Sequence, residues 1–150
     1  MAVLSWGKCS IYYAESEDGA VSDTATWTEI DTPKEDSTEL SSSAGDVVEA
    51  KEEGGAVVDA RVGKTTYELA FELFVKKGVA QPWTAEDGVI DGEWAFRVVP
   101  EDEECAGILI ERSILRTEET YNTADGIIVK YIAKVLKPAS GNSVKPYTAA

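Results

Sequence analysis

The chain has 150 residues, 43% of them hydrophobic, and its 28 acidic residues outnumber its 14 basic residues to give a formal net charge of −14. This length and apolar content suffice for one domain with a buried core, whereas the charge argues against wrapping nucleic acid or lying on an anionic membrane. The chain has no histidine, which excludes serine–histidine–aspartate and cysteine–histidine catalysis and imidazole-based metal sites.

The two cysteines, Cys9 and Cys105, have neither metal-ligand spacing nor a disulfide framework. We expect both to be reduced packing residues, as in a cytoplasmic protein. No sustained apolar segment precedes Lys8, and no apolar run approaches the roughly 20 residues of a membrane span. The sequence therefore predicts synthesis in the cytoplasm without a signal peptide.

The first third of the chain predicts short strands separated by turns. Residues 8–14 and 27–31 each fit a strand, and a polar, flexible loop with an Asp18-Gly19 turn joins them over 15–26.

An acidic hairpin or loop is predicted for residues 41–55. Residues 37–42 and 46–53 fit two polar strands joined by a Ser-Ser-Ala-Gly turn, and Gly54-Gly55 is the next break. A further extended segment follows at 56–62.

The strongest strand pattern lies in residues 65–77, where apolar and charged side chains alternate with a period of two. Phe74 interrupts the polar face, so we expect it to meet a second sheet or a neighbouring subunit. The apolar face comprises Tyr67, Leu69, Phe71, Leu73 and Val75, and the polar face Glu68, Glu72 and Lys76.

Later segments predict two more strands, over 94–98 and 107–120. Between strands, Thr84 followed by acidic residues is typical of a helix start, so we expect a short helix over 84–91. Residues 127–136 fit either a helix or a strand. Their β-branched side chains and the preceding Asp125-Gly126 turn favour a strand paired with 107–120.

The fold class predicted from these elements is mainly β. We expect one domain over residues 1–138, an antiparallel β-sandwich or small barrel with one short flanking helix, followed by a flexible C-terminal tail over 139–150.

No catalytic or cofactor site is predicted. Gly63-Lys64-Thr65-Thr66 is similar to the end of a phosphate-binding loop, but position 58 holds valine instead of the required glycine, and the segment opens a strand. A hairpin turn explains Gly63 better. Carboxylate pairs are abundant, and abundance without a shaped pocket does not indicate a glycosidase. We therefore predict a protein that is not an enzyme and binds no cofactor or metal.

Charge and tryptophan distribution indicate candidate contact surfaces. Residues 15–53 contain thirteen acidic and two basic residues, whereas the chain after Asp125 contains only basic ones. These regions are either two solvated surfaces or complementary faces that meet between subunits. Trp27 and Trp83 lie in or beside irregular segments and are either interface anchors or loops packed on their own domain.

The order of these parts resembles the major tail (tail-tube) proteins of phages and prophages. The resemblance rests on four stretches, 36–40 (DSTEL), 49–55 (EAKEEGG), 63–78 (GKTTYELAFELFVKKG) and 135–138 (VLKP), and spans about residues 30–138. It implies a two-sheet β-sandwich with a flanking helix. It also implies that six copies close into a ring, and that rings stack into a hollow tube that conducts DNA.

The resemblance assigns roles to the candidate residues. The acidic stretch 41–55 would reach the next ring, with the basic C-terminal segment as its counterpart, and a negative lumen would let DNA pass without tight binding. Expected partners are further copies, the tape-measure protein, the tail terminator and the baseplate or tail-tip proteins, in a virion tail assembled in the cytoplasm of a bacterial host. The candidate stacking and interface residues are Trp27, Glu49, Glu52, Glu53, Phe74, Trp83, Lys130, Lys134 and Lys137.

Three alternatives stay open. The first is a β-sandwich module that binds a carbohydrate or protein partner through Trp27 or Trp83. The second is an enzyme that uses carboxylates alone. The third, a connector or tail terminator, is a variant of the tube subunit.

Overall fold

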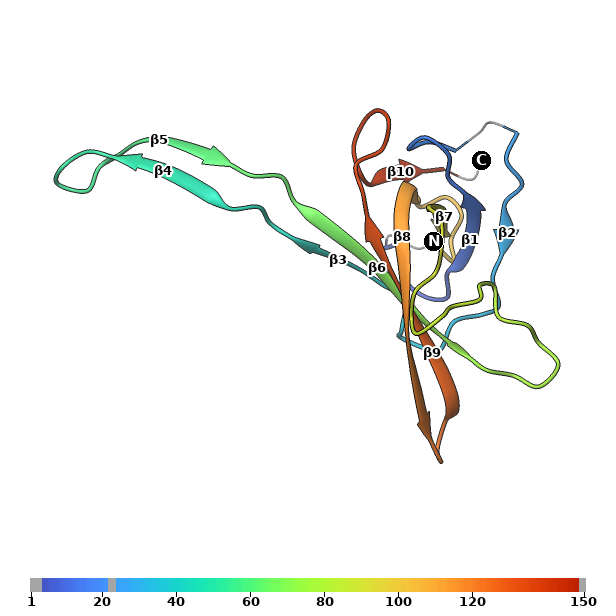
Figure 1. The fold of residues 1–150 in the computed structure, drawn as a ribbon. Helices are drawn as coiled ribbons and strands as arrows, with labels where there is room; N and C mark the ends of the chain where they lie inside the picture. Colours follow the sequence, from blue (N-terminus) through green and yellow to red (C-terminus); the bar gives the residue numbers. More distant parts are fainter. Residues whose placement is uncertain (1–3, 22–23, 149–150) are drawn as a thin grey trace.

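The computed structural model describes residues 4–21 and 24–148, and all regular secondary structure within them is β (Figure 1). The mainly β, antiparallel class is therefore confirmed. The strands are β1 (Ser10–Glu15), β2 (Thr28–Glu29), β3 (Glu39–Ser43), β4 (Val47–Lys51), β5 (Val57–Val62), β6 (Thr66–Phe74), β7 (Trp94–Val99), β8 (Gly107–Asn122), β9 (Gly126–Val135) and β10 (Lys145–Tyr147).

The main sheet has eight strands in the order β2-β1-β7-β8-β9-β6-β3, with β10 added beside β8. Every pairing is antiparallel. The 16-residue β8 is shared between two halves of the sheet, because its first residues pair with β7 and β10 and its later ones with β9. The strand path ends at β2 and β3 without joining, so of the predicted sandwich or small barrel, the barrel alternative is wrong.

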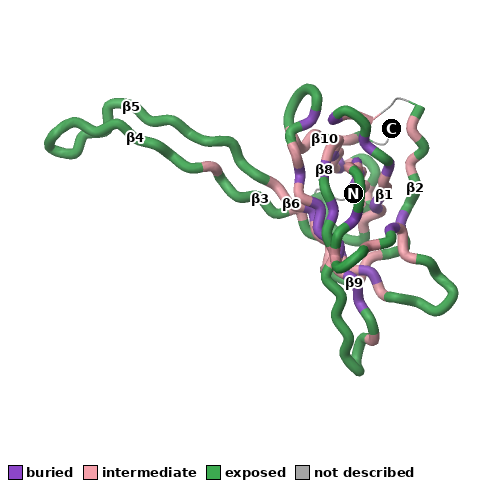
Figure 2. Tube along the Cα trace, viewed as in Figure 1, coloured by how far each residue is buried: buried purple, intermediate pink, exposed green. Residues whose placement is uncertain are grey.

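One face of this curled sheet encloses the core (Figure 2). Leu69, Phe71 and Leu73 of β6 are at most 2% exposed, as the alternation in 65–77 predicts. The β8–β9 hairpin is also confirmed, and its tight turn is held by Asn122, whose side-chain Oδ1 accepts from the backbone N–H of Asp125 at 2.7 Å. The centre of the fold is thus formed by its three longest strands, β6, β8 and β9.

The connection over 75–93 contains no helix, so the helix predicted for 84–91 is wrong. Glu86 and Val89 instead exchange two backbone hydrogen bonds of 3.0 Å across a tight turn. Asp87 and Gly88, the central residues, have φ of 50° and 83°, which a two-residue hairpin turn requires and a helix forbids. The connection packs against the core and contributes two buried side chains to it, Trp83 and Ile90.

The predicted turn between residues 37–42 and 46–53 is also wrong. β3 and β4 follow one another along the same side of a long ribbon, and β5 and β6 form the other side (Figure 1). The chain reverses only at 52–56, where the Glu52 N–H donates to the Ala56 carbonyl at 2.9 Å. Gly63, expected in a hairpin turn, lies in mid-ribbon opposite Asp46.

Two segments expected to be flexible carry structure in their described parts. Within 15–26, the Ser16 hydroxyl donates to the Glu111 carbonyl at 2.7 Å. Within 139–150, β10 pairs with β8, and Lys145 Nζ lies 2.8 Å from Glu111 Oε1. Residues 1–3, 22–23 and 149–150, which belong to the predicted domain, loop and tail, lie outside the described residues.

Candidate assembly surfaces

A two-stranded arm, which continues β3 and β6 beyond the body, is the largest feature outside the core. It begins as β3 and β6, continues as β4 and β5, and extends away from the body (Figure 1). All residues of β4 and β5 are exposed, and no strand of the body pairs with them (Figure 2). In the described structure, this distal arm, made of β4 and β5, is therefore held by the pairing of its own two strands.

Valines are exposed on both faces of this distal arm. Val47 and Val62 are cross-strand partners and are 56% and 71% exposed, while Val48 on the opposite face is 66% exposed. Val57 and Val58 of β5 are exposed as well. An isolated two-stranded ribbon is marginally stable in water, and clustered exposed apolar side chains are typical of a contact surface.

Gly45 and Gly63 face each other closely, in a glycine crossing, at the point where the β3–β6 pair continues into the distal arm. A Cβ atom on Gly45 would lie 2.3 Å from the Gly63 carbonyl carbon, so no other residue fits there without moving the backbone. The Gly63 N–H donates to the Asp46 carbonyl at 2.8 Å and closes the crossing. The sequence suggested turns at these glycines, but their role is the close approach of two strands.

The predicted acidic residues lie on the distal arm. Glu49, Glu52 and Glu53 are exposed, and Glu49 lies 3.7 Å from Lys51 in a surface ion pair. Gly54 and Gly55 form the tip with φ of 97° and 95°. The arm therefore presents carboxylates at its far end.

The predicted basic counterpart is largely neutralised within its own sheet. Lys130 of β9 lies between Glu72 of β6 and Glu118 of β8 in the strand register. Lys134 Nζ lies 4.0 Å from Glu68, which also contacts Arg116 at 3.6 Å. Cross-strand neighbours of opposite charge stabilise the sheet by themselves. Lys137, which follows β9, is exposed and forms no ion pair with any described residue.

Trp83 lies in the core of its own chain. It is 7% exposed, and its ring centre lies 4.6 Å from that of Tyr13 and 5.2 Å from that of Tyr131. Its Nε1 is buried without a hydrogen-bond partner among the described residues. Trp83 therefore offers little surface to a partner. Phe74 is half-buried near the end of β6.

Trp27 stacks on Arg97, a residue that the sequence pattern did not indicate. The Arg97 Cζ atom lies 3.9 Å from the centre of the Trp27 ring and 4.7 Å from that of Tyr147. This cation–π cluster joins β7 to the segment before β2 and to β10. No periodic signal predicts such a contact, because its three members are far apart in the sequence.

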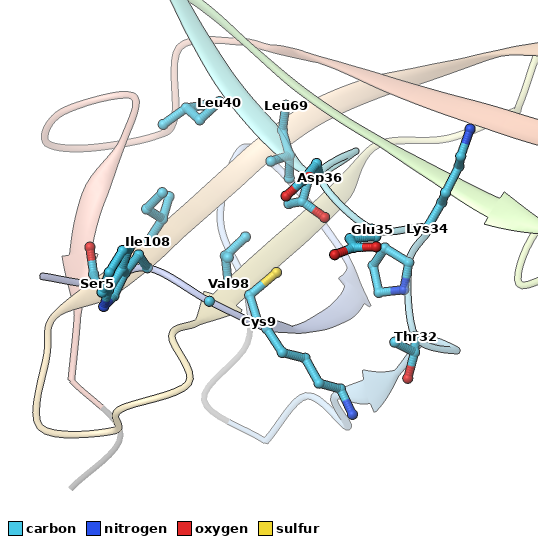
Figure 3. A pocket seen from close by; sticks show the side chains of 15 residues that line it. Ser5, Cys9, Thr32, Lys34, Glu35, Asp36, Leu40, Leu69, Val98 and Ile108 are labelled. Atoms are coloured by element: carbon cyan, nitrogen blue, oxygen red, sulfur yellow. The ribbon is translucent and has the colours of Figure 1, made fainter. Parts of the chain in front are cut away.

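A groove of about 600 Å³ opens beside the base of the arm (Figure 3). Leu40, Leu69, Val98 and Ile108 form its apolar floor, and residues 32–36 border it. In the described part of the chain, no group of three or more histidine, cysteine, aspartate or glutamate side chains could hold a metal ion. The groove therefore combines an apolar floor with a polar border.

Among the residues that the structure describes, Asp31 and Tyr131 have shifted pKa values. The hydrogen bond from Lys76, with Nζ 2.8 Å from Asp31 Oδ2, lowers the pKa of Asp31 and anchors the chain after β6 to the segment after β2. Burial raises the pKa of Tyr131 to about 12, and the nearby Glu119 carboxylate adds to the increase.

Comparison of this chain with models of known protein families and with curated proteins finds no match. Among the residues that the structure describes, no helix has the length and apolar character needed to cross a membrane.

Proposed function

We propose that this chain is a structural subunit that assembles with copies of itself, and that the assembly is a tail tube of the phage or prophage kind. The observation that carries the proposal is the distal arm, an unsupported ribbon with valines exposed on both faces. Full burial of each valine on a neighbouring copy would contribute about 1.5 kcal/mol. Contact with a neighbour thus supplies the stabilisation that the arm lacks alone.

The sheet edges support the same proposal. The main sheet ends at β3, whose outer edge continues along β4 without a partner strand in the described structure. Free edges of this kind pair readily with another chain. A head-to-tail contact of edge and arm repeats from copy to copy, and it forms a ring or a filament depending on the rotation between copies.

The finer parts of the proposal follow from the sequence resemblance. The two halves that share β8 would act as the two layers of a sandwich, and six copies would close a ring. Stacked rings would form a virion tail tube in the cytoplasm of a bacterial host, with tape-measure, terminator and tail-tip proteins as partners. A subunit with net charge −14 would line a lumen through which DNA passes without binding.

Electron microscopy of the purified protein over a concentration series, with light scattering on the same samples, tests this proposal. We expect rings or tubes of uniform width. Replacement of Val47 and Val62 by threonine keeps the β-branched shape and removes apolar surface, so it should raise the concentration needed for assembly at least about tenfold. Val89→Thr, at an exposed site on the body (62%), is the matched control.

A strict monomer at every concentration, or unchanged assembly of the valine variant, would contradict the proposed role of the arm. A monomer would favour the binding-module alternative, for which the groove beside the arm is the supporting observation. That alternative no longer rests on Trp27 and Trp83, because one stacks on Arg97 and the other lies in the core.

A further inference from the structure

Arg97 is a partly buried basic residue whose hydrogen-bonding groups are incompletely paired in the described structure. Its guanidinium lies against the rings of Trp27 and Tyr147, and its Nε atom is buried without a hydrogen-bond partner. The other arginines of the body have carboxylate partners, since Arg112 Nε lies 2.8 Å from Glu93 and Arg116 is paired with Glu68. Arg97 forms no ion pair with any described residue.

The geometry of the cluster restricts what can bind there. Guanidinium N–H groups point outward in the plane of the group, and the Arg97 Cζ atom lies over the faces of the Trp27 and Tyr147 rings. Nε is buried, but Arg97 keeps part of its surface exposed, so the terminal N–H groups are the accessible ones. A planar acceptor that approaches edge-on, such as a carboxylate, fits this arrangement with two parallel hydrogen bonds.

We infer that Arg97 binds a carboxylate from the arm tip of a second copy of this chain, supplied by Glu52 or Glu53. This inference rests on the proposed self-assembly. Both glutamates are exposed and form no ion pair within the described residues, whereas Glu49 is paired with Lys51. They also stand at the far end of the arm, the part of the chain best placed to reach another copy (Figure 1). Opposite charges brought together in this way set the register of a contact.

Charge exchange is the first test. We expect Arg97→Glu alone to raise the midpoint concentration of assembly at least about tenfold. The double variant with Glu52→Arg and Glu53→Arg should raise it by at least the same factor. The triple variant, which combines all three changes, should return to within about threefold of the wild type. Lys77→Glu is the control for Arg97→Glu, because it changes the net charge equally at an exposed site. Glu103→Arg with Glu104→Arg is the control for the tip pair.

Zero-length cross-linking is the second test, and it holds even if Arg97→Glu fails to fold. Arg97→Lys supplies an amine that a carbodiimide can couple to a carboxylate. In a mixture of isotopically labelled and unlabelled protein, we expect mass spectrometry to find position 97 joined to Glu52 or Glu53 of another copy. The Lys145–Glu111 pair, 2.8 Å apart within one chain, is the internal positive control.

The outcomes separate this inference from the proposed function. Assembly of the wild type combined with no effect of charge exchange, or with cross-links from position 97 only to other acids, would overturn the Arg97 site and leave self-assembly standing. A wild type that never assembles would overturn both. Rescue in the triple variant together with the cross-link between copies supports both.

Discussion

The Tyr131 hydroxyl lies at the edge of the aromatic core and has one hydrogen-bond partner, Gln81 Oε1, at 2.9 Å. The residue is 1% exposed, its ring stacks on Phe71, and Trp83 covers it from the 75–93 connection. Ionisation would place a negative charge in this apolar cluster beside Glu119, which is why the pKa of Tyr131 rises to about 12.

This shift makes stability at high pH depend on Tyr131. The unfolded chain releases the phenolic proton near the ordinary value of 10.0, whereas the folded chain keeps it to about 12. The free energy of unfolding therefore falls as the pH rises from 10 to 12. We expect this decrease to be larger in the wild type than in Tyr131→Phe, by on the order of 2 kcal/mol. Urea unfolding at several pH values measures the difference. Tyr121→Phe, at a site 73% exposed, should behave as the wild type, and equal slopes for Tyr131→Phe would contradict the expectation.

At the scale of strands, β6 was predictable because it runs through the core and buries every second side chain from Leu69 to Leu73. β8 and β9 do not alternate in this way, and they were predictable from their β-branched residues and the turn between them. The arm was predicted only as an acidic hairpin, because strands without a core face have no periodic pattern to mark where β3 continues into β4. The helix predicted at 84–91 failed because Thr84 and Asp87 suit a helix start and a tight turn equally. The Arg97 cluster depends on tertiary contacts alone.

The glycine crossing gives a test of the arm as an element. Gly45→Ala places a Cβ against the backbone of the opposite strand, so we expect faster amide hydrogen exchange throughout β4 and β5. The main unfolding transition should not move, since the distal arm contributes nothing to the core. Gly63→Ala, whose nearest contact is 3.2 Å, should have a smaller effect. Slow exchange in the Gly45 variant would show that the crossing does not hold the arm in register.

The whole molecule has net charge −14, with its arm tip acidic and the lysines of β9 largely paired with acids of neighbouring strands. Copies that approach one another therefore repel at long range, even where a local contact such as Arg97 with a carboxylate is favourable. Salt screens the long-range part most, because exposed charges more than about 10 Å apart hardly interact at about 0.1 M ionic strength.

Assembly should consequently become easier with salt. We expect the midpoint concentration to fall several-fold between about 10 mM and about 150 mM sodium chloride, as measured by light scattering. Sucrose at equal osmolarity is the control for effects unrelated to charge. A midpoint that rises with salt would mean that attraction between opposite charges, rather than net repulsion, dominates the approach of two copies.

The order in which strands are synthesised differs from the order in which they pair. β1 is made first, yet its partner over six residues is β7, which begins some eighty residues later, while β8 and β9 at the centre of the sheet follow later still. The ribbon of β3 to β6, by contrast, closes through a local reversal. Since contacts close in sequence form fastest, we expect the ribbon to begin closing before β1 pairs with β7, although it stays marginally stable until the core forms. The exposed valines of β4 and β5 are then available to neighbouring chains before the core is complete, which is the stage at which a folding chain is most prone to aggregate.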